Sequence, residues 1–269
     1  MAAVTSESLA AVQQEMAADL GRADLTVAAE LFSALDVLDT SAALRRSLTD
    51  PSRHAADRKA LVTRLFGDSA QQLSLSVLTS IAAKRWSKER DLADAVESLA
   101  VTAVAADAER HGLQGLEQLE SALLGFRRTV ADSHDVQRAL TDPQAQPQAK
   151  QTLARRLSPD ASEGARLLID RAVTASRGLR PSAAVEFYAQ RVAARQRHWI
   201  AQVTVARELD DAQRAKLARS LDSYFGRELR LDVVVDPAVV GGIRVQVGDE
   251  VVDSTMATKL STLNRRLAG

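Results

Sequence analysis

The sequence predicts an α+β fold that is predominantly α: a duplicated amino-terminal helical bundle followed by a small α/β carboxyl-terminal domain. Three observations support this. Apolar residues recur at helical spacing over residues 1–198, part of this region repeats at a fixed distance, and two-residue alternation begins only after Trp199. The 269 residues are enough for two domains or three small ones, each with its own core.

Three segments of the first 198 residues show the spacing of amphipathic helices. The apolar positions are Leu31, Phe32, Leu35 and Leu38; Leu92, Val96, Leu99 and Ala103; and Leu116, Leu119, Leu123, Phe126 and Val130. Gly112 and Gly115 lie between the second and third segments, where we expect a kink or a short turn. Each helix is expected to bury one stripe against its neighbours, as in helical bundles.

The helical region contains an internal duplication. SLTDP at 47–51 recurs as ALTDP at 139–143, so Asp142 lies 92 residues (142 − 50) after Asp50. The same offset pairs Leu61 with Leu153, Arg64 with Arg156, Leu65 with Leu157, Asp68 with Asp160 and Arg85 with Arg177. We expect Asp50 and Asp142 to cap helices whose first residues are Pro51 and Pro143.

Chance similarity between two helices rich in alanine and leucine is the alternative to duplication. Agreement of the caps, the basic residues and the spacing favours duplication. Residues 5–22 fall on 97–114 at the same offset, so one helix can belong to both copies. The predicted domains are residues 1–110 (first copy), 97–198 (second copy, sharing a helix) and 199–269 (α+β domain with a terminal helix).

The pattern changes after Trp199. A strand is expected around Ile200 to Val205, followed by a helix that a capping box at Asp210 and Gln213 opens and Gly226 closes. Further strands are expected at 229–235, 242–247 and 250–253, the last two forming a hairpin. A terminal helix carries an apolar stripe at Met256, Leu260, Leu263 and Leu267.

Composition excludes several function classes. The chain has no cysteine, which excludes disulfides, thiolate metal sites and cysteine nucleophiles, and fits a reducing cytoplasm. Its 35 basic residues balance 35 acidic ones and only 3% of residues are aromatic, so we expect no nucleic-acid binding. The amino terminus lacks the pattern of a signal peptide. No stretch is apolar enough to span a bilayer, so no direct membrane insertion is expected.

No catalytic, metal or cofactor site is expected. The four histidines, His54, His111, His134 and His198, are scattered and lack metal-binding spacing. His134 and Asp135 follow Ser133, but adjacent helical residues point in different directions, and no nucleophile elbow is present. Gly241-Gly242 is followed by no lysine with serine or threonine, which favours a turn before a strand over a phosphate loop.

The carboxyl-terminal pattern resembles the delta subunits of bacterial F-type ATP synthase, which are related to the mitochondrial oligomycin-sensitivity-conferring protein. The matching elements lie in residues 231–263 and are Asp236, Pro237, the Gly241-Gly242 pair, Gly248, Asp249 and Asp253. The chain departs from the family pattern at Ser254-Thr255, where glycine then serine is usual. The helical region is doubled, as in the long form that is typical of actinobacteria.

The resemblance implies a non-catalytic peripheral-stalk (stator) subunit at the cytoplasmic face of the cell membrane, as part of the ATP synthase complex. Such a subunit links the catalytic head to the b subunit of the membrane sector and resists rotational torque. The helical domain would contact amino-terminal segments of alpha subunits, and the carboxyl-terminal region would contact b. The stripe from Met256 to Leu267 is either core or a partner contact. Two alternatives are an unrelated helical scaffold and a regulatory or RNA-binding module. Such a module would bind its partner through short runs of basic residues along the helices.

Overall fold

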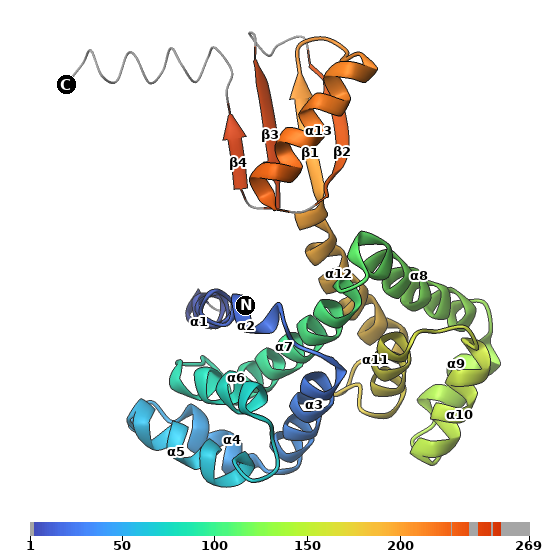
Figure 1. The fold of residues 1–269 in the computed structure, drawn as a ribbon. Coiled ribbons are helices and arrows are strands. Elements are labelled where there is room, and N and C mark those ends of the chain that lie inside the picture. Colours follow the sequence, from blue (N-terminus) through green and yellow to red (C-terminus); the bar gives the residue numbers. More distant parts are fainter. Residues whose placement is uncertain (1–2, 227, 237–241, 249, 254–269) are drawn as a thin grey trace. The chain divides into compact units, whose positions relative to one another are not determined.

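The computed structural model describes residues 3–226, 228–236, 242–248 and 250–253 (Figure 1). Helices occupy most of the chain, and a small mixed sheet follows them, which confirms the predicted fold class. Contacts divide the chain into two compact units, residues 1–192 and 193–269. Each unit is described separately below.

The helices of the first unit follow one another through short connections. They are α1 (Ala3–Glu15), α2 (Ala17–Leu20), α3 (Leu25–Thr40), α4 (Ala42–Thr49), α5 (Ala55–Phe66), α6 (Gln72–Ala83), α7 (Glu89–Glu109), α8 (Gly112–Ala131), α9 (His134–Thr141), α10 (Pro147–Leu157), α11 (Glu163–Thr174) and α12 (Pro181–Gln196). The three predicted apolar stripes are all buried, in α3, α7 and α8. The expected break at Gly112 is the turn between α7 and α8, where this glycine has φ +70°.

Helix α7 is the centre of the first unit (Figure 1). Its sequence from Leu92 to Ala106 is almost entirely buried, with alanine, serine and valine on several faces. A helix that is apolar on all sides belongs inside a protein rather than on its surface. Small side chains let neighbours approach closely: a Cβ added at Gly164 of α11 would lie only 3.0 Å from the Val104 side chain of α7. Helices α3, α8 and α11 all pack against it.

Two of the short helices begin with equivalent serine caps. Ser41 accepts a hydrogen bond from the Leu44 amide at 3.2 Å and starts α4, and Ser133 accepts one from the Val136 amide at 3.3 Å and starts α9. Each cap satisfies an amide that has no partner within the helix. The two serines are 92 residues apart (133 − 41), as are the two helices that they open.

The prediction that Asp50 and Asp142 are N-caps is wrong. Both residues instead end a helix, α4 and α9 respectively. The carboxylate of Asp50 accepts from the Ser52 amide at 2.9 Å, and that of Asp142 accepts from the Gln144 amide at 2.8 Å. This side-chain turn competes with helix formation. The next helices therefore start several residues later, and the proline at a first helical position is Pro147 of α10.

Helices recur in the first unit at the spacing of the sequence repeat. The starts of α4 and α9 are 92 residues apart (134 − 42), as are those of α5 and α10 (147 − 55) and those of α7 and α12 (181 − 89). Below, α3–α7 are called the first series and α8–α12 the second series. Two residues 92 positions apart are called counterparts.

In its described residues, the second unit contains a four-stranded sheet and the helix α13. The elements are β1 (Ile200–Val205), α13 (Asp211–Phe225), β2 (Arg230–Val235), β3 (Ile243–Val247) and β4 (Glu250–Asp253), after a short 3₁₀ turn, η1 (Arg197–Trp199). The strand order is β2-β1-β3-β4. Strand β1 is parallel to β2 and antiparallel to β3, and β3 and β4 form the predicted hairpin.

Residue alternation decides which face of this sheet is buried. Val203 and Val205 of β1 and Val245 and Val247 of β3 pack with Leu221 of α13. The predicted capping box is present: the Asp210 carboxylate accepts from the Gln213 amide at 2.7 Å, and the Asp210 amide donates to the Gln213 side chain at 3.1 Å. Gly226 ends α13 in the left-handed conformation at φ +68°, as glycine permits.

Candidate functional site

The loop between α11 and α12 turns back toward α7 at Arg177. Arg177 has φ +52°, and among the described residues it is the non-glycine residue with positive φ. Gly178 follows at φ +84°, and the Ser176 hydroxyl donates to the Leu179 carbonyl at 2.7 Å, which closes the turn. A left-handed conformation costs a non-glycine residue about 1 kcal/mol or more, so the contacts of the Arg177 side chain must offset this strain.

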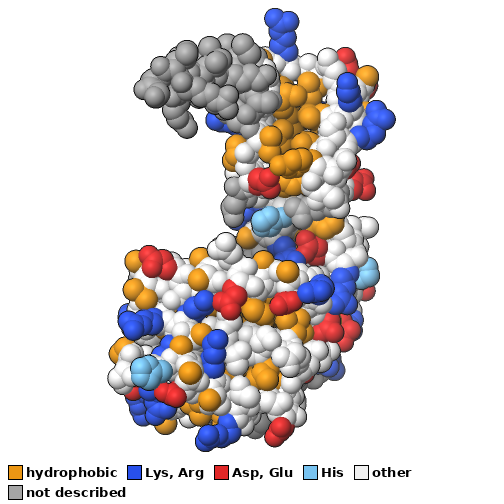
Figure 2. Space-filling view, turned by 60° about the vertical axis from the view of Figure 1, so that its left-hand side comes forward, with side chains coloured by type: hydrophobic (Ala, Val, Ile, Leu, Met, Phe, Trp, Pro, Cys, Tyr) orange, Lys and Arg blue, Asp and Glu red, His pale blue; other side chains and the backbone are white. Residues whose placement is uncertain are grey.

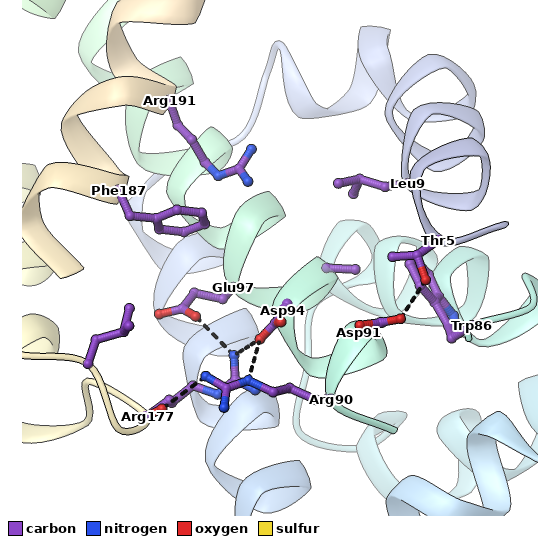
Figure 3. Close-up of a pocket in the computed structure, with 12 residues that line it drawn as sticks. Thr5, Leu9, Trp86, Arg90, Asp91, Asp94, Glu97, Arg177, Phe187 and Arg191 are labelled. Atoms are coloured by element: carbon purple, nitrogen blue, oxygen red, sulfur yellow. Dashed lines mark hydrogen bonds and ion pairs between the residues drawn. The ribbon is translucent and has the colours of Figure 1, made fainter. Parts of the chain in front are cut away.

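The guanidinium of Arg177 binds three carboxylates. It lies 2.6 Å from Asp94 and 3.0 Å from Glu97, both of α7 (Figure 3). It also lies 2.9 Å from Asp39 of α3, and its side chain is only 9% exposed. Burial by itself would lower the pKa of Arg177. The carboxylates of Asp39, Asp94 and Glu97 outweigh burial and raise the pKa, so this buried cation is held in its charged form.

Tyr188 of α12 completes the network. Its hydroxyl donates to the second oxygen of Glu97 at 2.7 Å, and both side chains are buried. Burial raises the pKa of Tyr188, and the neighbouring Glu97 carboxylate raises it further. The carboxylate of Glu97 is therefore shared between a cation and a neutral donor, which satisfies it without solvent.

An apolar cavity of about 140 Å³ lies beside this network, between α1, α7 and α12. Its apolar lining includes Leu9, Trp86, Leu179 and Phe187. In Figure 3, Leu9 extends from α1 and Arg191 from α12 toward the same space. An apolar cavity of about 150 Å³ holds one benzene-sized group, so this space suits a single large apolar side chain.

Arg191, at this cavity, has a polar atom without a hydrogen-bond partner among the described residues. Its guanidinium carbon lies 4.3 Å above the Phe187 ring, and its Nε atom is buried with no hydrogen-bond partner among the described residues. Burial lowers the pKa of Arg191, although Glu97 and Asp94 act in the opposite direction. A cation held over an aromatic ring beside an apolar cavity suits a partner carboxylate next to an apolar anchor.

The carboxylates at this site are engaged in structure rather than chemistry. Asp91 accepts from the Thr5 hydroxyl at 2.5 Å and from the Lys88 amide at 3.2 Å, while Asp94 and Glu97 are held by Arg177. These contacts account for the three carboxylates by structural roles, which are to hold α1 at the start of α7 and to hold the loop at Arg177. In the part of the chain that the structure describes, no group of histidine and acidic side chains has the arrangement of a metal site.

The described residues of the sequence motif, Asp236, Gly242, Gly248 and Asp253, lie at the ends of strands in the second unit. Asp236 follows β2, and its amide donates to the Val205 carbonyl at 2.9 Å. Gly242 has φ +88° just before β3, and Asp253 is the last residue of β4. Gly248 turns the hairpin at φ +58°, and a Cβ there would lie 2.5 Å from the His198 ring. The geometry therefore explains both glycines.

Several predicted residues lie outside the described residues. They are Pro237, Gly241, Asp249, Met256, Leu260, Leu263 and Leu267. The partner role of the stripe from Met256 to Leu267 stays a prediction.

Sequence reasoning missed the buried network and the cavity beside it. Arg177 was noted only as the counterpart of Arg85, and Asp39, Asp94, Glu97 and Tyr188 carried no motif. The available signal was two acidic residues three apart, Asp94 and Glu97, within an apolar helix pattern. Such a pair on a buried stripe requires a cation. Nothing local in the sequence identifies that cation as Arg177, 80 residues beyond Glu97 (177 − 97).

The surface of the described residues has mixed character. Figure 2 shows acidic and basic side chains intermixed on the face in view, and apolar side chains gathered on the sheet-containing unit. Exposed apolar residues of that unit are Tyr224, Val234, Val235, Val251 and Val252. Among the helices that the structure describes, none has the length and apolar content needed to cross a bilayer.

Comparison with known proteins identifies the family. The model of the ATP synthase delta (OSCP) subunit family matches residues 100–267. The chain is 46% identical to the ATP synthase subunit delta of Arthrobacter sp. (strain FB24) and 47% identical to that of Renibacterium salmoninarum, covering 100% of both chains in each case. It is 36% identical to that of Streptomyces griseus, again over 100% of both chains. The chain therefore belongs to the ATP synthase delta (OSCP) subunit family and is a non-catalytic subunit of the peripheral stalk.

Proposed function

We propose that this subunit links the alpha/beta catalytic head of ATP synthase to the b subunit of the membrane sector and resists rotational torque. Amino-terminal segments of alpha subunits contact the helical region, and the carboxyl-terminal region contacts b at the cytoplasmic face of the membrane. The family assignment supports membership of the complex. A link under load needs interfaces that dissociate slowly, and such interfaces rest on well-buried anchors.

The apolar cavity between α1, α7 and α12 is the observation that carries the head contact. It has room for one large apolar side chain, and Arg191 supplies a half-buried cation at its edge. An amphipathic helix presents an apolar anchor and a carboxylate one turn apart on the same face. We therefore assign this cavity to an amino-terminal segment of an alpha subunit.

The domain organisation supports the same role. The helical region is proposed to consist of two copies, residues 1–110 and 97–198, that share α7, followed by the α+β domain at 199–269. The recurrence of helix starts at 92 residues favours this division. The family motif at Asp236, Gly242, Gly248 and Asp253 shapes the sheet, and the stripe Met256, Leu260, Leu263 and Leu267 is proposed to contact b. Two contacts on one chain raise the effective concentration of each partner.

The head contact is tested by placing a charge in the cavity. Leu9→Asp should weaken binding to the purified head by at least about tenfold, because a carboxylate would replace an apolar wall of the anchor site. Val4→Asp is the matched control, since Val4 is exposed on the same helix and lies outside the cavity lining. Equal affinities of the two variants for the head would contradict the assignment.

The b contact is tested by truncation. Removal of residues 254–269 should weaken binding to the soluble part of b while the circular dichroism of the helical region is retained. Head binding serves as the internal control and should be unchanged. If the shortened and full-length chains bind b equally, the terminal stripe is not the contact.

A further inference from the structure

A second cavity, of about 710 Å³, lies within the second series between α9, α10 and the loop that leads into α12. Its apolar floor includes Val130, Leu140 and Val173, of which Leu140 is 1% and Val173 is 4% exposed. Its rim carries His134, Arg138, Lys150 and Arg180. We call it the basic cavity, and none of these residues belongs to the site around Arg177.

Two counterpart positions in the first series hold large, buried side chains. Arg58, the counterpart of Lys150, is buried and donates to the carbonyls of Ala82 at 2.7 Å, Ala83 at 2.9 Å and Lys84 at 3.3 Å. Trp86, the counterpart of Gly178, is also buried, and its indole donates to the Ile81 carbonyl at 2.9 Å. These two side chains seal the carboxyl-terminal end of α6.

In the second series the same positions leave the space open. Gly178 has no side chain, and a Cβ added there would meet no atom within 4 Å. Lys150 carries an ammonium group in place of the planar guanidinium, and it donates to no carbonyl among the described residues, whereas Arg58 donates to three. The basic cavity therefore exists because two positions that are occupied by Arg58 and Trp86 in the first series hold smaller or less branched groups in the second.

The charge of this cavity is of one sign. No acidic side chain is found among the described residues that line it. Arg138 pairs at 2.6 Å with Asp135 of its own helix, where both side chains are more than 80% exposed and the pair is therefore weak. Lys150 and Arg180 make no side-chain hydrogen bond or ion pair with any described residue. A concave wall lined by one sign of charge concentrates the field within it.

We propose that the basic cavity binds an acidic, amphipathic protein segment of a neighbouring subunit. Its carboxylates pair with Lys150 and Arg180, and an apolar side chain packs on Leu140 and Val173. This inference rests on the proposed function only for the identity of the partner as a subunit of the same complex. The concave shape does not fit a lipid surface, and the lining has no aromatic residue on which a nucleic-acid base would stack.

The experiment compares a double charge reversal with a matched control. Lys150→Glu/Arg180→Glu removes the attraction, and Arg156→Glu reverses an exposed charge on α10 that does not line the cavity. Lys150→Gln/Arg180→Gln is the milder second variant in case charge reversal disturbs folding, which circular dichroism reports. Binding is measured to a synthetic amphipathic helix of leucine and glutamate, to the purified head and to the soluble part of b, with anionic vesicles and single-stranded RNA as competing probes.

The double reversal should weaken binding to the synthetic helix and to one of the two subunit probes by at least about tenfold, with Arg156→Glu unchanged. Raised salt should weaken binding of the wild-type protein to the same two probes, because salt screens the attraction between opposite charges. Binding of the synthetic helix through Lys150 and Arg180 without binding of head or b would support the cavity and contradict the proposed function. The proposal is overturned if wild type binds none of the probes, if both double variants match wild type, or if anionic vesicles or single-stranded RNA bind the cavity more tightly than the acidic helix.

Discussion

The two helix series share a backbone plan but differ in where they place their long polar side chains. In the first series Arg58 is buried against helix-end carbonyls and Arg85 is exposed. In the second series the arrangement is the opposite. Lys150, the counterpart of Arg58, lies at an open cavity, and Arg177, the counterpart of Arg85, is buried among three carboxylates. Identical spacing and caps thus fix the helices, while a few counterpart positions decide which surfaces are sealed and which stay open.

The pair Arg85 and Arg177 shows this most clearly, because the residue type is the same. Arg177 is held by Asp39 of α3 and by Asp94 and Glu97 of α7, whereas the Arg85 side chain is exposed. The role of a repeated residue therefore depends on what the neighbouring series presents to it. Four comparisons between counterparts test this, and they follow in order of expected size.

The largest effect is expected at Arg177. Arg177→Met should lower the free energy of unfolding by about 3 kcal/mol, because the buried carboxylate of Glu97 loses its cation and the partly exposed Asp39 and Asp94 lose theirs as well. Arg85→Met, the same change at the exposed counterpart, should cost no more than about 0.5 kcal/mol. Urea unfolding measures both. Equal losses would remove the distinction between the two arginines.

Arg58 should follow. Arg58→Leu leaves the carbonyls of Ala82 and Ala83 without their donor and should lower the free energy of unfolding by about 2–3 kcal/mol. Lys150→Leu at the counterpart should change it by less than about 1 kcal/mol, since Lys150 makes no bond that is lost. The comparison fails if the lysine variant proves the less stable of the two in the same urea titration.

Tyr188 gives the second series a pH dependence that its counterpart Val96 does not provide. Burial and Glu97 raise the pKa of Tyr188 above the value of about 10 for an unfolded tyrosine. Its contribution is therefore complete below about pH 10 and is lost as pH rises from there toward the folded pKa, at up to about 1.4 kcal/mol per pH unit.

Tyr188→Phe should flatten this alkaline loss. Chemical denaturation of both proteins from pH 8 to pH 11 measures the slope of stability against pH. Parallel slopes for wild type and variant above pH 10 would show that Tyr188 titrates alike in folded and unfolded chains.

The smallest effect is expected from making the second series resemble the first. Lys150→Arg supplies a guanidinium that can reach the end of α11, and it should raise the free energy of unfolding by about 0.5–1 kcal/mol. A rise in the thermal midpoint would be the supporting observation. An unchanged or lower midpoint would mean that α11 does not accept the cap that Arg58 gives to α6.

Much of the fold was predictable because it rests on local rules. Apolar spacing located α3, α7 and α8, and the pair Asp210 and Gln213 located the start of α13. Alternation after Trp199 located the strands and the hairpin. Each of these features needs only the residues within a few positions of itself.

The turns at Asp50 and Asp142 and the site around Arg177 were not predictable in the same way. Asp50 and Asp142 precede prolines, as an N-cap does, yet their carboxylates form turns that end the preceding helices. Local sequence permits both outcomes, and packing selects one.

The ion pairs of Arg177 and the openness of the basic cavity depend on residues far apart in the chain, so no short segment of the sequence contains all the residues that form them.

The burial of α7 on every side has a consequence for how the first unit fails. Both series rest on this one helix, through α3 on one side and α8 and α11 on the other. If one series unfolded alone, it would expose apolar surface of α7 to solvent, and the other series packs against the same helix. Residues 1–192 should therefore unfold as one cooperative block, and a load carried through α7 is opposed by the packing of both series rather than by that of one.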